Sequence, residues 1–303
     1  MKVPMGKVEL EVGSKYFDLN LRESNNILGD PLALRQRMKE DGYLFIRGLQ
    51  DRASVLRGQQ RILEFIAEQD AIAPGTALND AIINPNGKYP RTMGLPAITH
   101  DPAVRSVLES KEIFEFFNSY FGKQPLTFDY KWLRCVRNPD HTGAHLDIVY
   151  MGRGSTENLY TCWTPFQDLS LEMGTLALCV GSHDGGGFTK LRETYGRMDV
   201  DRDRVGGFFS DDPKELVDKF GGKWRTTEQF HAGDVLIFGM WTMHGSLNNQ
   251  TNRWRISCDT RFQPADEPVD DRWIGENPKA HYAWLVEPDK VVPMAKARSE
   301  WGV

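Results

Sequence analysis

Residues 233–255 read GDVLIFGMWTMHGSLNNQTNRWR and combine several patterns in a row. A glycine turn and an apolar run are followed by a second extended run, Thr242–Leu247, which carries His244. Arg255 follows eleven residues after that histidine, at the start of the alternating run Trp254–Gln263. Short extended runs separated by turn residues are typical of β-sandwiches and barrels. The stretch therefore predicts a mainly β core.

The same pattern of short extended runs separated by turn residues continues along the chain from about residue 125 onward. It favours a sandwich or barrel over a parallel α/β sheet, because the runs are short and are broken by turn residues. A Gly- and Asp-rich insert at 184–230 is too long for a hairpin connection and predicts a lid-like or binding excursion rather than core. The predicted strands are Leu126–Val136, Gly143–Met151, Asn158–Gln167, Thr175–Val180, Asp234–Phe238, Thr242–Leu247 and Trp254–Gln263.

Residues 1–122 read as mostly helical, with apolar residues at helical spacing. A short strand is expected at Gly42–Gly48, and 70–96 reads as loop. We predict a single domain over 1–303, because no linker-like run separates the mostly helical part of the chain from the part with short extended runs. In that domain the helices pack on a core at 123–263, and 264–303 forms a C-terminal extension. The predicted helices are Pro31–Glu40, Asp51–Gln69, Pro102–Ser110 and Lys111–Tyr120.

Composition excludes several classes of function. The 303 residues carry a formal charge of −5, so no global positive field would attract nucleic acid or an anionic membrane. The longest apolar stretch is too short for a membrane span, and the first residues lack the apolar segment of a signal peptide. The four cysteines form no C-x-x-C pair, so we interpret them as reduced, buried thiols. We expect a cytoplasmic protein with no nucleic-acid or membrane partner.

The first candidate for chemistry is the sequence His145-Leu146-Asp147. In an extended run, side chains two positions apart point to the same face, so an imidazole and a carboxylate would lie side by side. Completed by a distant histidine such as His244, they would form the two-histidine, one-carboxylate facial triad that leaves three positions of an iron ion open. Three ligands with open positions also suit zinc hydrolysis. The H-x-D pair alone is a common pattern.

The second candidate is Arg255. An arginine on the strand after the distal histidine is able to grip one carboxylate of a dicarboxylate while the other end of that molecule chelates a metal. Along Trp254–Phe262 the residues alternate, with Arg255, Asp259 and Arg261 on a polar face and mostly apolar residues on the other. A surface strand and a strand lining a wet barrel cavity both produce this pattern. Arg261 is interpreted as the partner of Asp259 or another carboxylate, or as a contact for an anionic substrate group.

These pieces together resemble the phytanoyl-CoA dioxygenase-like family of iron(II)- and 2-oxoglutarate-dependent oxygenases. The resemblance runs from about Gly42 to Pro264. It rests on DGYLFIRGL at 41–49, His145-Leu-Asp147, WTPFQDLSLEMGTLALCVGSH at 163–183 and the closing strands at 233–255, in that order. Each piece is unspecific, but the ordered set is specific. The resemblance implies a double-stranded β-helix (jelly-roll, cupin-like) core with packed helices.

The resemblance also implies roles for individual residues. His145, Asp147 and His244 match the iron ligands, and Arg255 matches the arginine that pairs with the far carboxylate of 2-oxoglutarate. Further positions match residues that line the co-substrate site in relatives. These are Ser246, Trp163 and, as the apolar contact, Leu133, while the basic contact is one of Lys88, Arg91 and Lys131.

The implied reaction consumes iron-bound 2-oxoglutarate and O2, releases succinate and CO2, and hydroxylates an unactivated C–H bond of a small or medium organic substrate. The carboxylate of Asp147 favours hydroxylation over halogenation, because halogenating relatives have a small residue there. Desaturation remains open, as do the substrate and the oligomeric state. Tyr150, Arg134 and the pair Phe208-Phe209 are further candidates for the substrate pocket. The alternative is a non-catalytic jelly-roll binding or scaffold protein.

Overall fold

The computed structural model describes residues 1–281 and 288–303. Its centre is a six-stranded antiparallel sheet in which β4, β12, β7, β14 and β5 follow one another, and β6 also pairs with β14. These strands are β4 (Tyr43–Ile46), β5 (Pro125–Thr127), β6 (Trp132–Val136), β7 (Tyr160–Pro165), β12 (Val235–Gly239) and β14 (Arg255–Pro264).

A second sheet faces the first and has the order β13, β9, β10, β3. It consists of β3 (Phe17–Asp18), β9 (Leu176–Val180), β10 (Lys223–Arg225) and β13 (His244–Ser246). Trp163 of the first sheet and Leu178 of the second belong to one buried apolar cluster, which fills part of the space between the sheets. Two facing sheets of this kind form the predicted jelly-roll core, so the fold class is confirmed.

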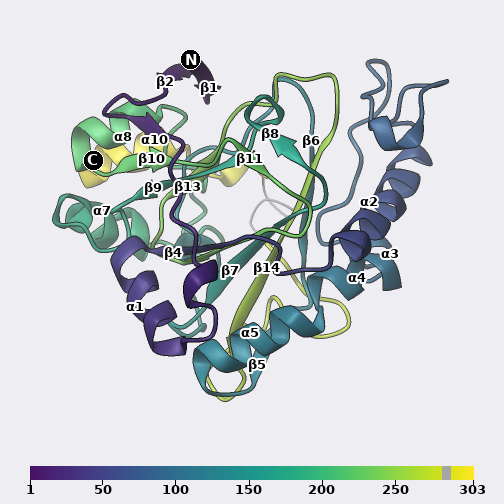
Figure 1. The fold of residues 1–303 in the computed structure, drawn as a ribbon. Coiled ribbons are helices and arrows are strands. Elements are labelled where there is room, and N and C mark those ends of the chain that lie inside the picture. The colour runs from purple at the N-terminus through teal and green to yellow at the C-terminus, as the bar shows by residue number, and fades with distance from the viewer. Residues whose placement is uncertain (282–287) are drawn as a thin grey trace.

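Helices cover the outer face of the six-stranded sheet (Figure 1). The helices α1 (Pro31–Asp41) and α5 (Lys111–Phe121) pack on one half, where Cys162 and Phe262 point outward. The helices α2 (Arg52–Ala67) and α4 (Pro102–Leu108) pack on the other half. The outward residues of β14 are therefore the apolar set of its alternation, and the polar set faces the second sheet.

The predicted helices are confirmed within two residues at their ends, and their caps explain where they begin. Asp30, Asp51 and Asp101 each accept hydrogen bonds from backbone amides of the first turn, and a proline follows two of them. Gly42, with a φ of 78°, ends α1 in the left-handed region and turns the chain into β4.

Two strand predictions are wrong. Leu126–Val136 is not one strand, because the chain leaves the sheet at Phe128–Lys131 between β5 and β6. Gly143–Met151 is not a strand either: Ala144 and His145 form isolated bridges, and the helix α6 (Ile148–Met151) follows at once. The carbonyl of Asp147 accepts the backbone amides of Tyr150 and Met151, which fixes this turn of helix.

The insert at 184–230 is not separate from the core, contrary to the prediction. Its strand β10 lies inside the second sheet, and Leu191, Leu216 and Trp224 are fully buried. They belong to the cluster on the outer face of that sheet, together with residues of the N-terminal hairpin β1–β2, which the sequence did not predict. The elements involved are β1 (Lys2–Met5), β2 (Val8–Glu11), η4 (Gly186–Phe188), α7 (Thr189–Glu193), η5 (Tyr195–Arg197), α8 (Pro213–Phe220), β11 (Gln229–Phe230) and α10 (Met294–Trp301).

Short elements complete the fold, and we propose that helices and sheets form a single domain because they share continuous apolar clusters. Within the described residues, no helix has the length and apolar character needed to cross a membrane. All four cysteines are buried and unpaired, as predicted. The remaining elements are η1 (Asn25–Ile27), η2 (Leu78–Asp80), α3 (Pro96–Thr99), β8 (Leu169–Ser170), η3 (Leu171–Met173) and η6 (Pro288–Lys290).

Candidate metal centre and adjoining cavities

His145, Asp147 and His244 meet between the two sheets. Their candidate ligand atoms all lie within 4.8 Å of one another, and all three residues are buried. Both Nε2 atoms lie 3.8 Å from Oδ1 of Asp147, and the two imidazole centroids are 4.1 Å apart. Two nitrogens and one carboxylate oxygen converging on one point have the composition of a facial iron site.

The backbone holds the two histidines together. The amide of His145 donates to the carbonyl of His244 at 2.9 Å, and the reverse bond is 3.0 Å long. Each ring also donates through Nδ1 to a carbonyl, Gly143 O at 2.8 Å and Thr242 O at 2.9 Å. Because carbonyls only accept, these bonds place the proton on Nδ1 and leave the Nε2 lone pairs free to bind a metal.

Burial and charge keep the three groups in the protonation states that a metal needs. Desolvation lowers the pKa of His145 well below 6.5, helped by the neighbouring ring of His244, and lowers the pKa of His244 too. Burial alone would raise the pKa of Asp147, but Arg261 and the two histidines outweigh it and bring that pKa below its usual range. Neutral imidazoles and an ionised carboxylate therefore coexist at neutral pH.

The position of Asp147 does not follow from strand alternation, so the sequence argument for the pair was wrong although the residues do meet. Asp147 has helical dihedral angles, φ −65° and ψ −26°, and precedes α6. Its Oδ2 lies 3.1 Å from Nη2 of Arg261 and accepts the hydroxyl of Thr161. Arg261 is thus the partner of a nearby carboxylate, one of its predicted roles, whereas Asp259 pairs with Arg134 at 3.1 Å.

Arg255 lies at the start of β14, on the strand face that points toward the second sheet. Its side chain is 1% exposed, and Nη1 donates to Ser257 Oγ at 2.7 Å. Nε and Nη2 are buried without any hydrogen-bond partner. Burial, with the repulsion of Arg134, lowers the pKa of Arg255 to about 10. A buried guanidinium with two unused donors fits the carboxylate of a dicarboxylic acid such as 2-oxoglutarate.

The other residues predicted for the co-substrate site occupy different places. Ser246 is on the same strand as His244, two positions on, and its hydroxyl accepts the amide of Thr142. Trp163 packs in the apolar cluster between the sheets, with its ring 4.9 Å from that of Phe230. Leu133 belongs to the cluster under α2 and α4 and also contributes to the wall of the larger cavity described below, while its neighbour Arg134 faces the interior.

None of the three basic candidates contacts this interior. Lys131 is buried elsewhere and lies 3.0 Å from Glu109 in an ion pair. Lys88 and Arg91 are exposed. The basic residue common to the walls of both cavities is Arg134, which the sequence indicated only for the substrate pocket.

Two cavities open beside the triad. The smaller, of about 220 Å³, includes His145 and Asp147 in its wall, and the larger, of about 460 Å³, extends toward the loop at 89–93. Met93, Arg134 and Phe208 line both cavities and form the boundary between them. The rest of the smaller cavity is formed by Trp132, Tyr150, Met151, Arg261 and His281.

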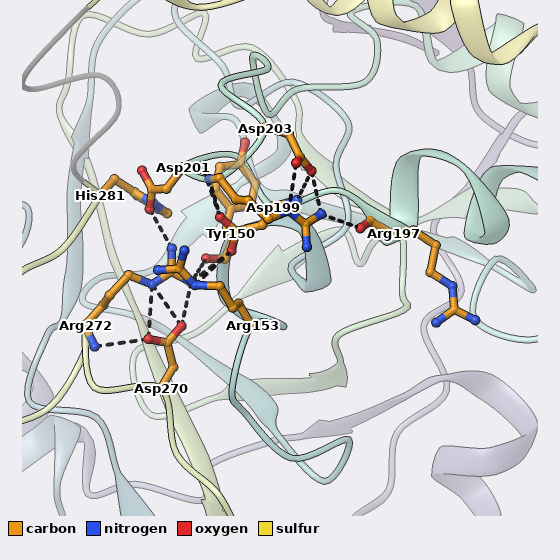
Figure 2. Close-up of polar contacts among 10 residues, drawn as sticks. Tyr150, Arg153, Arg197, Asp199, Asp201, Asp203, Asp270, Arg272 and His281 are labelled. Carbon is orange, nitrogen blue, oxygen red and sulfur yellow. Dashed lines mark hydrogen bonds and ion pairs between the residues drawn. The ribbon is translucent and has the colours of Figure 1, made fainter.

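A buried ion-pair cluster holds one wall of the smaller cavity (Figure 2). Arg272, in the C-terminal extension, donates to Asp270, to Asp201 at 2.5 Å and to Asp199 at 3.2 Å. His281 contacts Asp201 through Nδ1 at 3.0 Å, and its ring lies 5.5 Å from that of Tyr150. The cluster thereby ties the insert to the extension and holds His281 in the wall of the smaller cavity.

The sequence analysis missed Met93, Trp132 and His281 as cavity residues. Phe208, Tyr150 and Arg134 do line the cavity, whereas Phe209 is buried in the cluster outside the second sheet. The sequence around His281 contains no motif with a specific spacing that could have indicated this position.

Comparisons with known proteins agree with this geometry. The phytanoyl-CoA dioxygenase (PhyH) family profile matches residues 38–257. A 1-deoxypentalenic acid 11-beta-hydroxylase from Streptomyces arenae is 26% identical over 251 residues, covering 79% of this chain and 83% of the relative. Among solved structures, the epimerase SnoN, in complex with Fe3+, alpha ketoglutarate and nogalamycin RO, superposes with a TM-score of 0.52 at 16% identity, covering 81% and 88%. The non-heme alpha ketoglutarate dependent carbocyclase SnoK has the same TM-score at 18% identity, covering 82% and 87%.

Proposed function

Because this chain belongs to the phytanoyl-CoA dioxygenase family and is an iron(II)- and 2-oxoglutarate-dependent oxygenase, we propose that it hydroxylates an unactivated C–H bond of a small or medium-sized organic molecule. The hydroxylase from Streptomyces arenae supports this choice of reaction. The observation that carries the proposal is that the protein combines a buried triad with Arg255, whose Nε and Nη2 have no hydrogen-bond partner and are able to bind an anion.

In this proposal His145, Asp147 and His244 hold iron(II), and Arg255 binds the far carboxylate of 2-oxoglutarate. Bound iron and 2-oxoglutarate supply the oxidation, in which O2 and 2-oxoglutarate become succinate and CO2 and one oxygen atom is inserted into the substrate C–H bond. Arg261 and Thr161 hold the Asp147 carboxylate in place. The apolar wall formed by Trp132 and its neighbours excludes water around the reacting bond.

The alternatives receive less support from the site. A non-catalytic jelly roll would gain nothing from burying a guanidinium with two unpartnered nitrogens, since such burial is unfavourable unless a ligand compensates it. Zinc hydrolysis requires no dicarboxylate clamp. We also propose a cytoplasmic location, which the four buried, unpaired cysteines support.

The test is an anaerobic titration of iron(II) and 2-oxoglutarate into the apoprotein, which follows the weak visible charge-transfer band of the chelate. We expect a band in the wild type, a weaker one in Arg255→Ala at the same 2-oxoglutarate concentration, and none in His244→Ala. Lys131→Met is the matched control, because Lys131 is buried but pairs with Glu109 away from the triad. A folded wild type that shows no band would overturn the proposal.

A further inference from the structure

Arg134 is the basic residue at the boundary of the two cavities. It lies on β6 and its side chain is 23% exposed, so it is reached from the open interior. Nε lies 3.1 Å from Oδ2 of Asp259, which fixes the orientation of the guanidinium. Within residues 1–281 and 288–303, no hydrogen bond occupies either terminal nitrogen, Nη1 or Nη2.

The other polar groups of the smaller cavity are already engaged. Arg261 pairs with Asp147 and lies over the ring of Trp132, 4.5 Å from its centroid. His281 contacts Asp201 in the Arg272 cluster. Most of the remaining wall is aromatic or thioether surface. A ligand in this cavity therefore meets one guanidinium edge with terminal nitrogens to spare, beside a largely apolar wall.

The charged side chains around the interior also favour an anionic ligand. Three guanidinium groups surround the interior, the buried Arg255 and Arg261 and the partly exposed Arg134, and the carboxylates paired with Arg134 and Arg261 are Asp259 and Asp147. The acidic residues near His281 form a separate group paired with Arg272. Iron(II) and fully ionised 2-oxoglutarate carry opposite charges of equal size. Loading therefore leaves these side chains with one guanidinium group more than carboxylates.

We propose that the substrate is a compact apolar carboxylic acid and that Arg134 binds its carboxylate. The two terminal nitrogens of a guanidinium match the two oxygens of a carboxylate. The apolar skeleton then lies along Trp132, Met151 and Phe208, within reach of the triad that His145 and Asp147 bring to the same cavity. This inference rests on the proposed function, since it assigns the substrate of that same site.

The test compares two probes of equal shape, adamantane-1-carboxylate and 1-adamantanemethanol. Calorimetry measures the binding of each to the anaerobic holoenzyme loaded with iron(II) and 2-oxoglutarate. We expect the wild type to bind the carboxylate about 10- to 100-fold more tightly than the alcohol, as a charge-assisted pair provides. Arg134→Gln should remove this preference, and Arg134→Lys should keep part of it. Arg57→Gln, at a side chain 66% exposed on α2, is the control and should behave as the wild type.

Several outcomes would overturn the inference. One is that the wild type binds the two probes equally well, and another is that it binds neither. Both outcomes are measured on the wild type alone. A third is an Arg134→Gln enzyme that keeps the preference but binds 2-oxoglutarate tenfold more weakly, since Arg134 would then serve the co-substrate. If the charge-transfer band forms and only the carboxylate preference is missing, the proposed function stands and this inference alone fails. Absence of the band overturns both.

Discussion

Replacing Arg255 by methionine should stabilise the apoprotein and at the same time weaken 2-oxoglutarate binding. Burial lowers the pKa of Arg255 from 12.5 to about 10, so the folded state disfavours the charged form at every pH below that value. A depression of this size corresponds to about 3 kcal/mol. The substitution also removes the Nη1–Ser257 Oγ hydrogen bond, which contributes about 1 kcal/mol. The net gain of about 2 kcal/mol should raise the Tm by roughly 4 °C.

The same substitution removes the two free donors that await a carboxylate. Two charge-assisted hydrogen bonds together contribute about 3 to 4 kcal/mol, which is roughly 150- to 900-fold in the Kd of 2-oxoglutarate. Differential scanning fluorimetry with and without 2-oxoglutarate, together with the anaerobic titration, measures both effects. Arg57→Met serves as control. If the apoprotein Tm falls, or the Kd rises less than tenfold, the assignment of Arg255 as an unpaired anion clamp is refuted.

Four further predictions concern buried ionisable residues. Burial lowers the pKa of His145 and His244 below 6.5, so on acidification the unfolded chain takes up protons before the folded one does. The unfolding free energy of the apoprotein should therefore fall between about pH 7 and 5. In urea denaturation at several pH values, the variant with glutamine at both positions should show a weaker dependence of the unfolding free energy on pH. Arg261→Gln frees the triad carboxylate and should weaken iron(II) binding about 10- to 100-fold in a chelator competition, and an unchanged affinity would contradict its positioning role. Arg272→Met leaves buried carboxylates without their cation and should destabilise the fold by about 3 to 5 kcal/mol in urea. Lys131→Met should leave the Kd of 2-oxoglutarate unchanged within twofold, and a larger rise would place that lysine at the co-substrate after all.

The closing strands were the part of the fold that the sequence predicted best. The alternation of Arg255, Asp259 and Arg261 with apolar residues is a local property, and it correctly gave the two faces of β14. Alternation does not say whether a polar face meets water or a cavity. That choice depends on the second sheet, whose strands come from distant parts of the chain.

Around the triad, residue identity was a better guide than local geometry. Asp147 was found as a candidate, yet it precedes a turn of helix where the β-branched Ile148 and Val149 favour a strand. Leu133 and Arg134 differ by one position, and in a strand one position decides which face a side chain occupies. His281 escaped prediction because its place is set by ion pairs with residues about eighty positions away.

The Arg272 cluster also has a consequence for how the protein is made. A ribosome adds about 5–20 residues per second, so Arg272 is synthesised roughly one to three seconds after Arg255. Once Arg255 has been added, every side chain assigned to iron or 2-oxoglutarate has been translated. The guanidinium of Arg272, which joins Asp199 and Asp201 to Asp270, has not yet been made. The chain therefore contains every assigned cofactor ligand before it contains the arginine that joins one wall of the smaller cavity.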